Sequence, residues 1–229
     1  MSFHIVVPAA GNGFRFGARM PKQYLLLHGK PVLQHALERL TLAFPGALVH
    51  VVLAAEDHWF ERTIATGDYV RPLRCGGATR AESVRNALRS LEAAQRDDWV
   101  LVHDAVRPCL DLPSSVRLKN ELAGSDVGGF LAVPVSDTLK RVDDTELVLR
   151  TESRDALWRA QTPQMFRYGV LRDAFELEGA ELATDEAHAV ERLGLRPRIV
   201  AGSACNVKIT FPEDMELAAA ILTAQTGAS

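Results

Sequence analysis

Two cations follow a stretch of small residues near the N-terminus. Pro8-Ala9-Ala10-Gly11 comes directly after a short apolar run, and Arg15 and Lys22 lie beyond it. Small residues allow backbone N–H groups to approach a phosphate closely. Arginine holds phosphate oxygens as a planar fork, and lysine does so as a point charge. The pattern therefore predicts a phosphate-binding loop, and its alternative is a tight turn that binds no ligand.

The glycine spacing of this loop argues against two common nucleotide motifs. A dinucleotide fingerprint needs a third glycine at the position that Phe16 occupies here. It also needs an acidic residue at the end of a strand about 20 positions further on, and this sequence has none there. A P-loop needs a Gly-Lys-Ser/Thr ending, whereas Lys22 lies between Pro21 and Gln23. A nicotinamide-dependent oxidoreductase and a P-loop protein are therefore disfavoured.

Two further charged residues stand where ligands usually bind. Asp104 follows the apolar run 99–103, and the ligands of open parallel sheets bind at the carboxyl ends of strands. The alternative role of Asp104 is to cap the next element. Lys208 lies between Val207 and Ile209 in an expected apolar strand, where a lysine without a function is unusual. No histidines have the spacing of a catalytic metal site.

Short apolar runs alternate along the chain with amphipathic stretches. The runs are almost continuously apolar, as in the strands of a parallel sheet that is covered on both faces. Capping-box patterns predict two helix starts, one at Thr79–Glu82 and one at Thr210–Glu213, and the second helix is expected to reach about residue 224. The fold class is therefore α/β, with a Rossmann-like, mostly parallel sheet and helices on both faces. The expected strands are 3–7, 49–54, 99–103 and 130–133, with a further helix over 32–44.

Residues 136–154 break this alternation. The stretch is polar, charged and β-prone, and it contains the turn-like sequence Asp143-Asp144-Thr145-Glu146. It predicts a protruding β-hairpin arm. Because an isolated hairpin is only marginally stable, we expect the arm to pack on a partner subunit and to form a homodimer.

Composition and length exclude several classes of protein. The 229 residues are 47% hydrophobic and 24% charged with a net charge of −3, which fits a globular protein and not a basic nucleic-acid binder. No apolar run approaches the roughly 20 residues of a membrane span. The three cysteines are far apart, so neither a disulfide framework nor a zinc site is expected. Without a clear linker or targeting segment, we expect one domain over residues 1–229, located in the cytoplasm.

The loop and six later segments resemble one enzyme family. The loop residues are Pro8-Ala9-Ala10-Gly11, Arg15 and Pro21-Lys22-Gln23-Tyr24-Leu25. The later segments are 76–84, 102–108, 137–140, 157–164, 184–186 and 206–210. In this order they are similar to the 2-C-methyl-D-erythritol 4-phosphate cytidylyltransferases of the non-mevalonate isoprenoid pathway. Each segment alone is weak evidence for the family, but seven of them in the same order over nearly the whole chain make the resemblance specific.

The resemblance implies transfer of a cytidylyl group from CTP to 2-C-methyl-D-erythritol 4-phosphate, with release of pyrophosphate. It implies that Arg15 and Lys22 act at the α-phosphorus, and that Arg154 and Lys208 place the phosphate of the acceptor. Arg154, on the arm, would serve the site of the partner subunit. Mg²⁺ or another divalent cation is implied by the triphosphate, with Asp104 as the candidate protein ligand. Nucleotide contacts are implied for Ala9, Ala10, Gly11, Gly77, Ser83 and Ala105, and acceptor contacts for Asp104, Arg107, Thr138, Thr162 and Thr184.

Two residues depart from the family pattern. Ala78 follows Gly77 where the family usually has a polar residue, and Val106 stands where it usually has alanine. These changes bear on nucleotide affinity more than on the type of reaction. Two alternatives stay open: a cytidylyltransferase for another alditol phosphate, such as ribitol 5-phosphate, and a non-catalytic nucleotide-binding protein. The presence of Arg15, Lys22 and Lys208 argues against the second.

Overall fold

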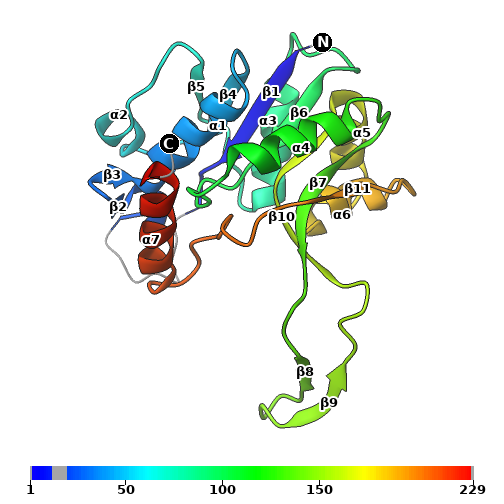
Figure 1. Ribbon diagram of the computed structural model, residues 1–229. Helices are drawn as coiled ribbons and strands as arrows, with labels where there is room; N and C mark the ends of the chain where they lie inside the picture. The colour runs from blue at the N-terminus through cyan, green and yellow to red at the C-terminus, as the bar shows by residue number, and fades with distance from the viewer. Residues whose placement is uncertain (1, 12–19, 228–229) are drawn as a thin grey trace.

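One mixed, mostly parallel sheet runs through the protein. The computed structural model describes residues 2–11 and 20–227. Within them, a sheet of seven strands has the order β11-β7-β10-β6-β1-β4-β5, in which β10 is antiparallel to both neighbours and the other pairs are parallel (Figure 1). The expected α/β class is therefore confirmed. The strands are β1 (Phe3–Pro8), β4 (Leu48–Val52), β5 (Val70–Leu73), β6 (Trp99–Val102), β7 (Gly128–Pro134), β10 (Trp158–Arg167) and β11 (Arg198–Ala201).

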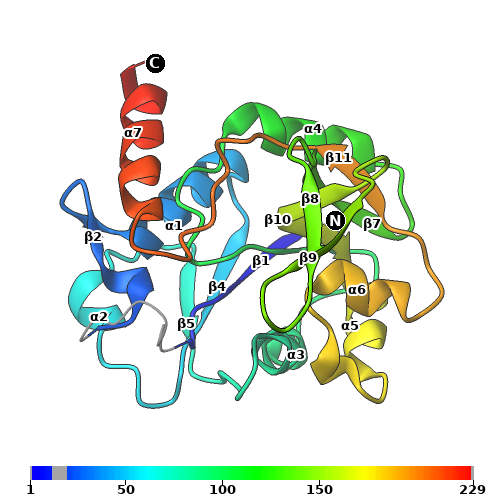
Figure 2. The same ribbon diagram turned by 90° about the horizontal axis from the view of Figure 1, so that it is seen from below.

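Helices cover both faces of this sheet (Figure 2). On one face, α1 (Val32–Ala43) and α4 (Leu112–Leu122) bury leucines against the β1 side chains of Ile5 and Val7. On the other face, α3 (Arg80–Ser90), α5 (Tyr168–Glu176) and α6 (Glu186–Glu191) pack against Val6 of the same strand. Alternate residues of β1 thus point into two different cores, which explains why Ile5, Val6 and Val7 are all apolar. The shorter elements are the 3₁₀ helices η2 (Lys22–Tyr24) and η3 (Ala180–Leu182), the two-residue strands β2 (Leu26–Leu27) and β3 (Lys30–Pro31), and α2 (Phe60–Thr63).

The C-terminal helix α7 (Asp214–Gly227) lies beside the sheet and closes a third, smaller apolar cluster around Ile209 and Leu222. The expected capping box at Thr210 is wrong. The carboxylate of Asp214 accepts hydrogen bonds from the backbone N–H groups of Thr210 (2.7 Å) and Phe211 (2.8 Å), and the Thr210 hydroxyl donates to the Lys208 carbonyl (3.3 Å). The helix therefore starts at Asp214. The box at Thr79 is present, with both of its hydrogen bonds.

A two-stranded hairpin extends from the sheet, as expected for residues 136–154 (Figure 1). It pairs β8 (Leu139–Val142) with β9 (Val148–Glu152) in antiparallel register. In its turn, the carboxylate of Asp143 accepts hydrogen bonds from the backbone N–H groups of Thr145 (2.8 Å) and Leu147 (3.1 Å). Because β7 leads into the arm and β10 leads back out of it, β10 enters the sheet antiparallel to β7. Exposed apolar side chains gather on the arm: Val142, Leu147, Val148 and Leu149.

Two histidines of the sheet are neighbours in its interior. The rings of His4 in β1 and His50 in β4 have centroids 5.8 Å apart. His4 Nδ1 and His50 Nε2 are buried and have no hydrogen-bond partner among the described residues. Burial, assisted by nearby His4 and Arg71, lowers the pKa of His50 to about 4. Burial also lowers the pKa of His4, against the pull of Asp98.

We expect the free energy of unfolding to fall as the pH is lowered from about 6.5 to about 4. In this interval His50 takes up a proton in the unfolded chain but resists it in the folded one, so acid favours unfolding. Urea titrations at a series of pH values measure the effect. The variant His50→Leu should lose stability less steeply with acid than the wild type. His58→Leu, at an exposed position, should match the wild type, and equal slopes in all three proteins would contradict the prediction.

Candidate active site

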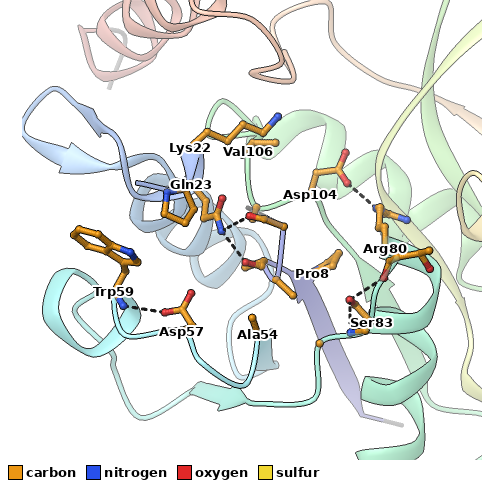
Figure 3. A pocket seen from close by; sticks show the side chains of 18 of the residues that line it. Pro8, Lys22, Gln23, Ala54, Asp57, Trp59, Arg80, Ser83, Asp104 and Val106 are labelled. Carbon is orange, nitrogen blue, oxygen red and sulfur yellow. Dashed lines mark hydrogen bonds and ion pairs between the residues drawn. The ribbon is translucent and has the colours of Figure 1, made fainter. Parts of the chain in front are cut away.

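An open cavity of about 1210 Å³ lies at the carboxyl ends of β1, β4 and β6. The loops that follow these strands form its wall, together with the loop after β5 and the segment before α7 (Figure 3). Asp104 and Arg80 lie on the same side as Ser83, and Trp59 and Asp57 lie on the opposite side. This is the edge at which open parallel sheets bind their ligands. Nine of the predicted site residues line this cavity: Ala9, Ala10, Gly11, Lys22, Gly77, Ser83, Asp104, Ala105 and Lys208. A tenth, Arg107, lies behind Asp104.

The loop after β1 is fixed by its own backbone and by one amide side chain. Ala9 donates its N–H to the Val52 carbonyl at 2.8 Å, which continues the pairing of β1 with β4. The buried Gln23 donates from Nε2 to the carbonyls of Ala9 (2.7 Å) and Gly11 (3.1 Å). The loop amides are thus held at the cavity wall by a residue that we did not single out from the sequence. The predicted cation Arg15 lies outside the described residues.

A second loop, between β5 and α3, forms the adjacent wall. Gly76 donates its N–H to the Leu53 carbonyl at 2.9 Å. Gly77 donates its N–H to the Ser83 hydroxyl (3.0 Å), which in turn donates to the Thr79 carbonyl (2.9 Å). The Ser83 hydroxyl therefore shapes this loop in addition to lining the cavity.

The replacement Gly76→Ala is expected to weaken nucleotide binding and to lower the free energy of unfolding by about 1–3 kcal/mol. An added Cβ would stand 2.4 Å from the Ala10 side chain and 2.8 Å from the Leu53 carbonyl, so the two loops would be pushed apart. Isothermal titration with CTP and urea denaturation measure the two effects. Gly67→Ala is the matched control, since a Cβ there meets nothing within 4 Å. Equal behaviour of both variants would contradict the close approach of the loops.

Three cations converge on the buried carboxylate of Asp104. Its Oδ1 accepts a hydrogen bond from Arg80 Nε at 3.1 Å, and its Oδ2 lies 3.2 Å from Arg107 Nε and 3.0 Å from Lys208 Nζ. Burial opposes the ionisation of Asp104, but Arg80, Lys208 and Arg107 outweigh it and hold the pKa of this carboxyl well below its usual range. Asp104 is therefore an anion at any physiological pH. Lys208 lies in the loop before α7 and not in a strand, which corrects the expected element.

Arg80 is the cation that sequence reasoning missed. It binds both carboxylate oxygens of Glu186, at 2.7 Å and 3.1 Å, and its side chain still reaches the cavity. Glu186 has no exposed surface. Burial disfavours the charge of Arg80, but Glu186 and Asp104 outweigh it and raise its pKa. A signal was present in the sequence, because a helix dipole disfavours a cation in the first turn, where Arg80 stands.

The side chain of Lys22 lines the cavity and reaches the segment before α7. Its Nζ donates to the Ile209 carbonyl at 2.9 Å, in the residue that follows Lys208. Lys22 lies in η2, on the opposite side of Asp104 from Arg80 (Figure 3). Lys22, Arg80 and Lys208 thus face one cavity from three separate segments of the chain.

The remaining predicted residues do not line the cavity in the single chain. Thr162 is buried behind Asp104 and accepts its backbone N–H at 3.0 Å. Thr138 and Arg154 are exposed at the base of the hairpin, where Arg154 donates to the Ser136 carbonyl. Thr184 is exposed before α6, next to His188. Their predicted contacts with an acceptor stay predictions.

The cavity wall combines cations and backbone amides with a few carboxylates, those of Glu56, Asp57 and Asp104. Among the residues that the structure describes, no group of three or more His, Cys, Asp or Glu side chains could hold a metal ion. The two departures from the family pattern lie in the wall, where Ala78 donates its N–H to Glu82 (2.7 Å) and Val106 lines the cavity. Such a site suits a polyphosphate and can stabilise charge that develops on phosphate oxygens. Within residues 2–11 and 20–227, no helix is long and apolar enough to cross a membrane.

Comparisons with known proteins agree on one family. A family model described as 2-C-methyl-D-erythritol 4-phosphate cytidylyltransferase matches residues 3–224. A relative of that name from Dechloromonas aromatica (strain RCB) is 53% identical over 225 residues, which are 97% of this chain and 98% of the relative. A crystal structure of 4-diphosphocytidyl-2C-methyl-D-erythritol synthase is similar with a TM-score of 0.86 and 38% identity, over 96% of this chain and 98% of the other. The Francisella tularensis 2-C-methyl-D-erythritol 4-phosphate cytidylyltransferase has a TM-score of 0.84 and 34% identity, over 96% and 100% of the two chains.

Proposed function

This chain belongs to the 2-C-methyl-D-erythritol 4-phosphate cytidylyltransferase family, and from that membership we propose how its cavity carries out the reaction. The enzyme is a nucleotidyltransferase that transfers a cytidylyl group from CTP to 2-C-methyl-D-erythritol 4-phosphate. The products are 4-diphosphocytidyl-2-C-methyl-D-erythritol and pyrophosphate, in isoprenoid precursor biosynthesis. The observation that carries the proposal is the convergence of Lys22, Arg80 and Lys208 on one cavity.

The reaction requires no base from the protein. A phosphate oxygen of the acceptor attacks the α-phosphorus of CTP. The bond from that phosphorus to the oxygen that links it to the β-phosphorus breaks, and this oxygen leaves as a terminal oxygen of pyrophosphate. The attacking oxygen is already ionised at neutral pH, so no proton has to be removed. The barrier arises from bringing two anions together and from the charge of the leaving group, and the protein lowers it by positioning and by electrostatic stabilisation.

The nucleotide would lie along the loops after β1 and β5. Amides of Ala9, Ala10 and Gly11 would hold its phosphates. Gly77, Ser83 and Ala105 would contact base and ribose, all from the cavity wall. Lys22, with Arg15, would stabilise the transition state at the α-phosphorus. The small residues of both loops support this placement, since they allow close approach of a ligand to the backbone.

The acceptor would lie on the Asp104 side of the cavity. Lys208 would bind its phosphate and Asp104 its hydroxyls, with Arg107 behind them. Lys208 is suited to this role because its side chain is half-exposed and turned toward the buried Asp104 carboxylate. Thr162, Thr138 and Thr184 remain proposed acceptor contacts, the last two at positions that are exposed in the single chain.

The donor set of the cavity fits a divalent cation that enters with the substrate. Asp104 is already paired with three cations, which leaves little room for a metal held by protein ligands alone. Mg²⁺ commonly binds through substrate phosphates with one or two carboxylates and retained water. We therefore place Mg²⁺, or another divalent cation, mainly on the oxygens of the triphosphate. Asp104 is the candidate protein ligand, and it would bind the cation by giving up one of its three present partners. When bound, the cation supplies neutralisation of charge on the leaving pyrophosphate.

We propose that the protein is one domain over residues 1–229 that works as a homodimer in the cytoplasm. The arm supports the dimer, because exposed apolar side chains such as Leu147, Val148 and Leu149 need cover. Crossing of the arms would bring Arg154 and Thr138 to the cavity of the partner. The three cysteines, none of which forms a disulfide, suit the reducing cytoplasm.

Pyrophosphate release with Mg²⁺ tests this function. Each of the four nucleoside triphosphates would be combined with 2-C-methyl-D-erythritol 4-phosphate or with ribitol 5-phosphate. We expect turnover with CTP and 2-C-methyl-D-erythritol 4-phosphate. Turnover with ribitol 5-phosphate alone would keep the chemistry and replace the acceptor. No release by folded protein would refute the proposal.

A further inference from the structure

Five polar residues at and behind the Asp104 carboxylate are almost fully buried. They are His103, Asp104, Arg107, Thr162 and Asn206, and each has at most 9% of its surface exposed. They come from the loop after β6, from the middle of β10 and from the segment before α7. Burying so many polar groups is costly unless they are hydrogen-bonded to one another.

The first half of their hydrogen bonds runs through His103. Asp104 donates its backbone N–H to the Thr162 hydroxyl at 3.0 Å. The same hydroxyl lies 3.0 Å from His103 Nδ1, and His103 Nε2 lies 3.1 Å from the Arg107 carbonyl. A carbonyl only accepts, so Nε2 carries the proton. In a neutral ring Nδ1 is then the acceptor, and the Thr162 hydroxyl donates to it. This single tautomer gives both ring nitrogens of His103 and the Thr162 hydroxyl a partner.

The second half runs through Asn206 and closes the ring. Arg107 donates from Nη1 to the Asn206 carbonyl at 2.7 Å, and Asn206 donates from Nδ2 to the Thr162 carbonyl at 2.7 Å. A register shift of β10 against β7 between Ala160 and Gln164 frees this stretch from regular pairing, so that Thr162 can serve both halves. The five residues thus form a closed circuit of hydrogen bonds.

We propose that His103 and Asn206 are positioning residues, which hold Asp104, Arg107 and the segment leading to Lys208 in place through this circuit. The inference rests on the proposed function, because it assigns these held residues to the acceptor. His103 does not line the cavity, so it touches no reacting atom. Among the described contacts, neither positioning residue has a hydrogen bond with the loops after β1 and β5, which would hold the phosphates of the nucleotide. Ala105 is the one proposed nucleotide contact in the loop that the circuit holds. We therefore expect the circuit to affect acceptor placement much more than CTP binding.

Kinetics of two variants test the proposal. His103→Gln keeps a donor near the Arg107 carbonyl but removes the acceptor for Thr162, and Asn206→Ser removes the donor to the Thr162 carbonyl. Each variant leaves a buried partner unsatisfied, so kcat/KM for the acceptor is expected to fall by about 10–100-fold. The Kd for CTP, measured by titration calorimetry, should stay within about twofold of the wild type, a split that loss of folding would not produce.

The control and a second measurement keep the outcomes distinct. His35→Asn removes a bond of the same kind, from His35 Nε2 to the Leu27 carbonyl at 2.7 Å, and should leave the kinetics unchanged. In the wild-type protein, ¹⁵N NMR should show His103 protonated at Nε2 alone. The opposite tautomer, or variants with normal acceptor kinetics beside an active wild type, would overturn the inference. An inactive wild type would overturn the proposed function itself.

Discussion

Replacing Lys208 with alanine is expected to lower kcat by about 10²–10³-fold, the effect of removing one preorganised donor from a developing charge. Lys208 Nζ lies 3.0 Å from Asp104 Oδ2 at the cavity, in a segment that is held by Asn206 on one side and α7 on the other. The lysine would meet the acceptor phosphate as the new bond to the α-phosphorus forms. Its charge matters most when two anions are forced together, so kcat should suffer more than the KM for CTP.

Steady-state release of pyrophosphate measures this effect, and a matched lysine controls for the loss of one charge. Lys30 is exposed and paired with Glu38 at 3.0 Å on the surface, where such pairs contribute little. Lys30→Ala should keep full activity. Because Asp104 retains Arg80 and Arg107 in the Lys208→Ala protein, that variant should stay folded. A kcat within threefold of the wild type would remove Lys208 from the proposed mechanism.

Replacing Arg154 with alanine is expected to lower activity by about 10²-fold, and the loss should be complemented between subunits. Arg154 is exposed at the base of the hairpin in the single chain, whereas Lys208 lines the cavity. If Arg154 acts on the partner, a mixed dimer of Arg154→Ala and Lys208→Ala protomers has one intact site. Its kcat per dimer should then be about half that of the wild type.

Two purification tags on coexpressed chains isolate this mixed dimer. The matched control places both substitutions in one protomer and pairs it with a wild-type protomer. This second dimer has the same composition, but its wild-type cavity would receive the substituted arm and its other cavity would lack Lys208. It should be nearly inactive. The reverse result, an active control and an inactive first dimer, would show that Arg154 acts within its own chain.

The sequence was most informative where a segment is buried on both faces. The apolar runs of β1, β4, β6 and β7 were recognisable because helices cover them on each side. β5 and β11 were not expected, since they are edge strands with exposed Arg71 and Arg198 and lack a continuous apolar pattern. Strand β10 was hidden for another reason: its polar Gln161, Thr162 and Gln164 are paired by long-range contacts that a local pattern does not show.

Half of the candidate site was likewise accessible from local patterns. The small residues and cations of the first loop stand out by type, and Asp104 stands out by its place after a strand. The bidentate contact of Arg80 with Glu186 joins residues 106 positions apart, and the Gln23 bonds to the first loop depend on η2 folding back over it. Such contacts depend on tertiary packing and cannot be predicted from the spacing of residue types along the sequence.

The Asp104 carboxylate, paired with three cations, occupies a position where the proposed substrate phosphate would bind. Three cations brought together without an anion would repel one another and strain the loops that carry them. With the carboxylate between them, the cluster can assemble during folding in its working arrangement. In the proposed reaction, the acceptor phosphate would compete with Asp104 for Lys208, so that binding would exchange one anion for another. Such an exchange would select for a strongly charged ligand, because a weakly charged one could not displace the Asp104 carboxylate.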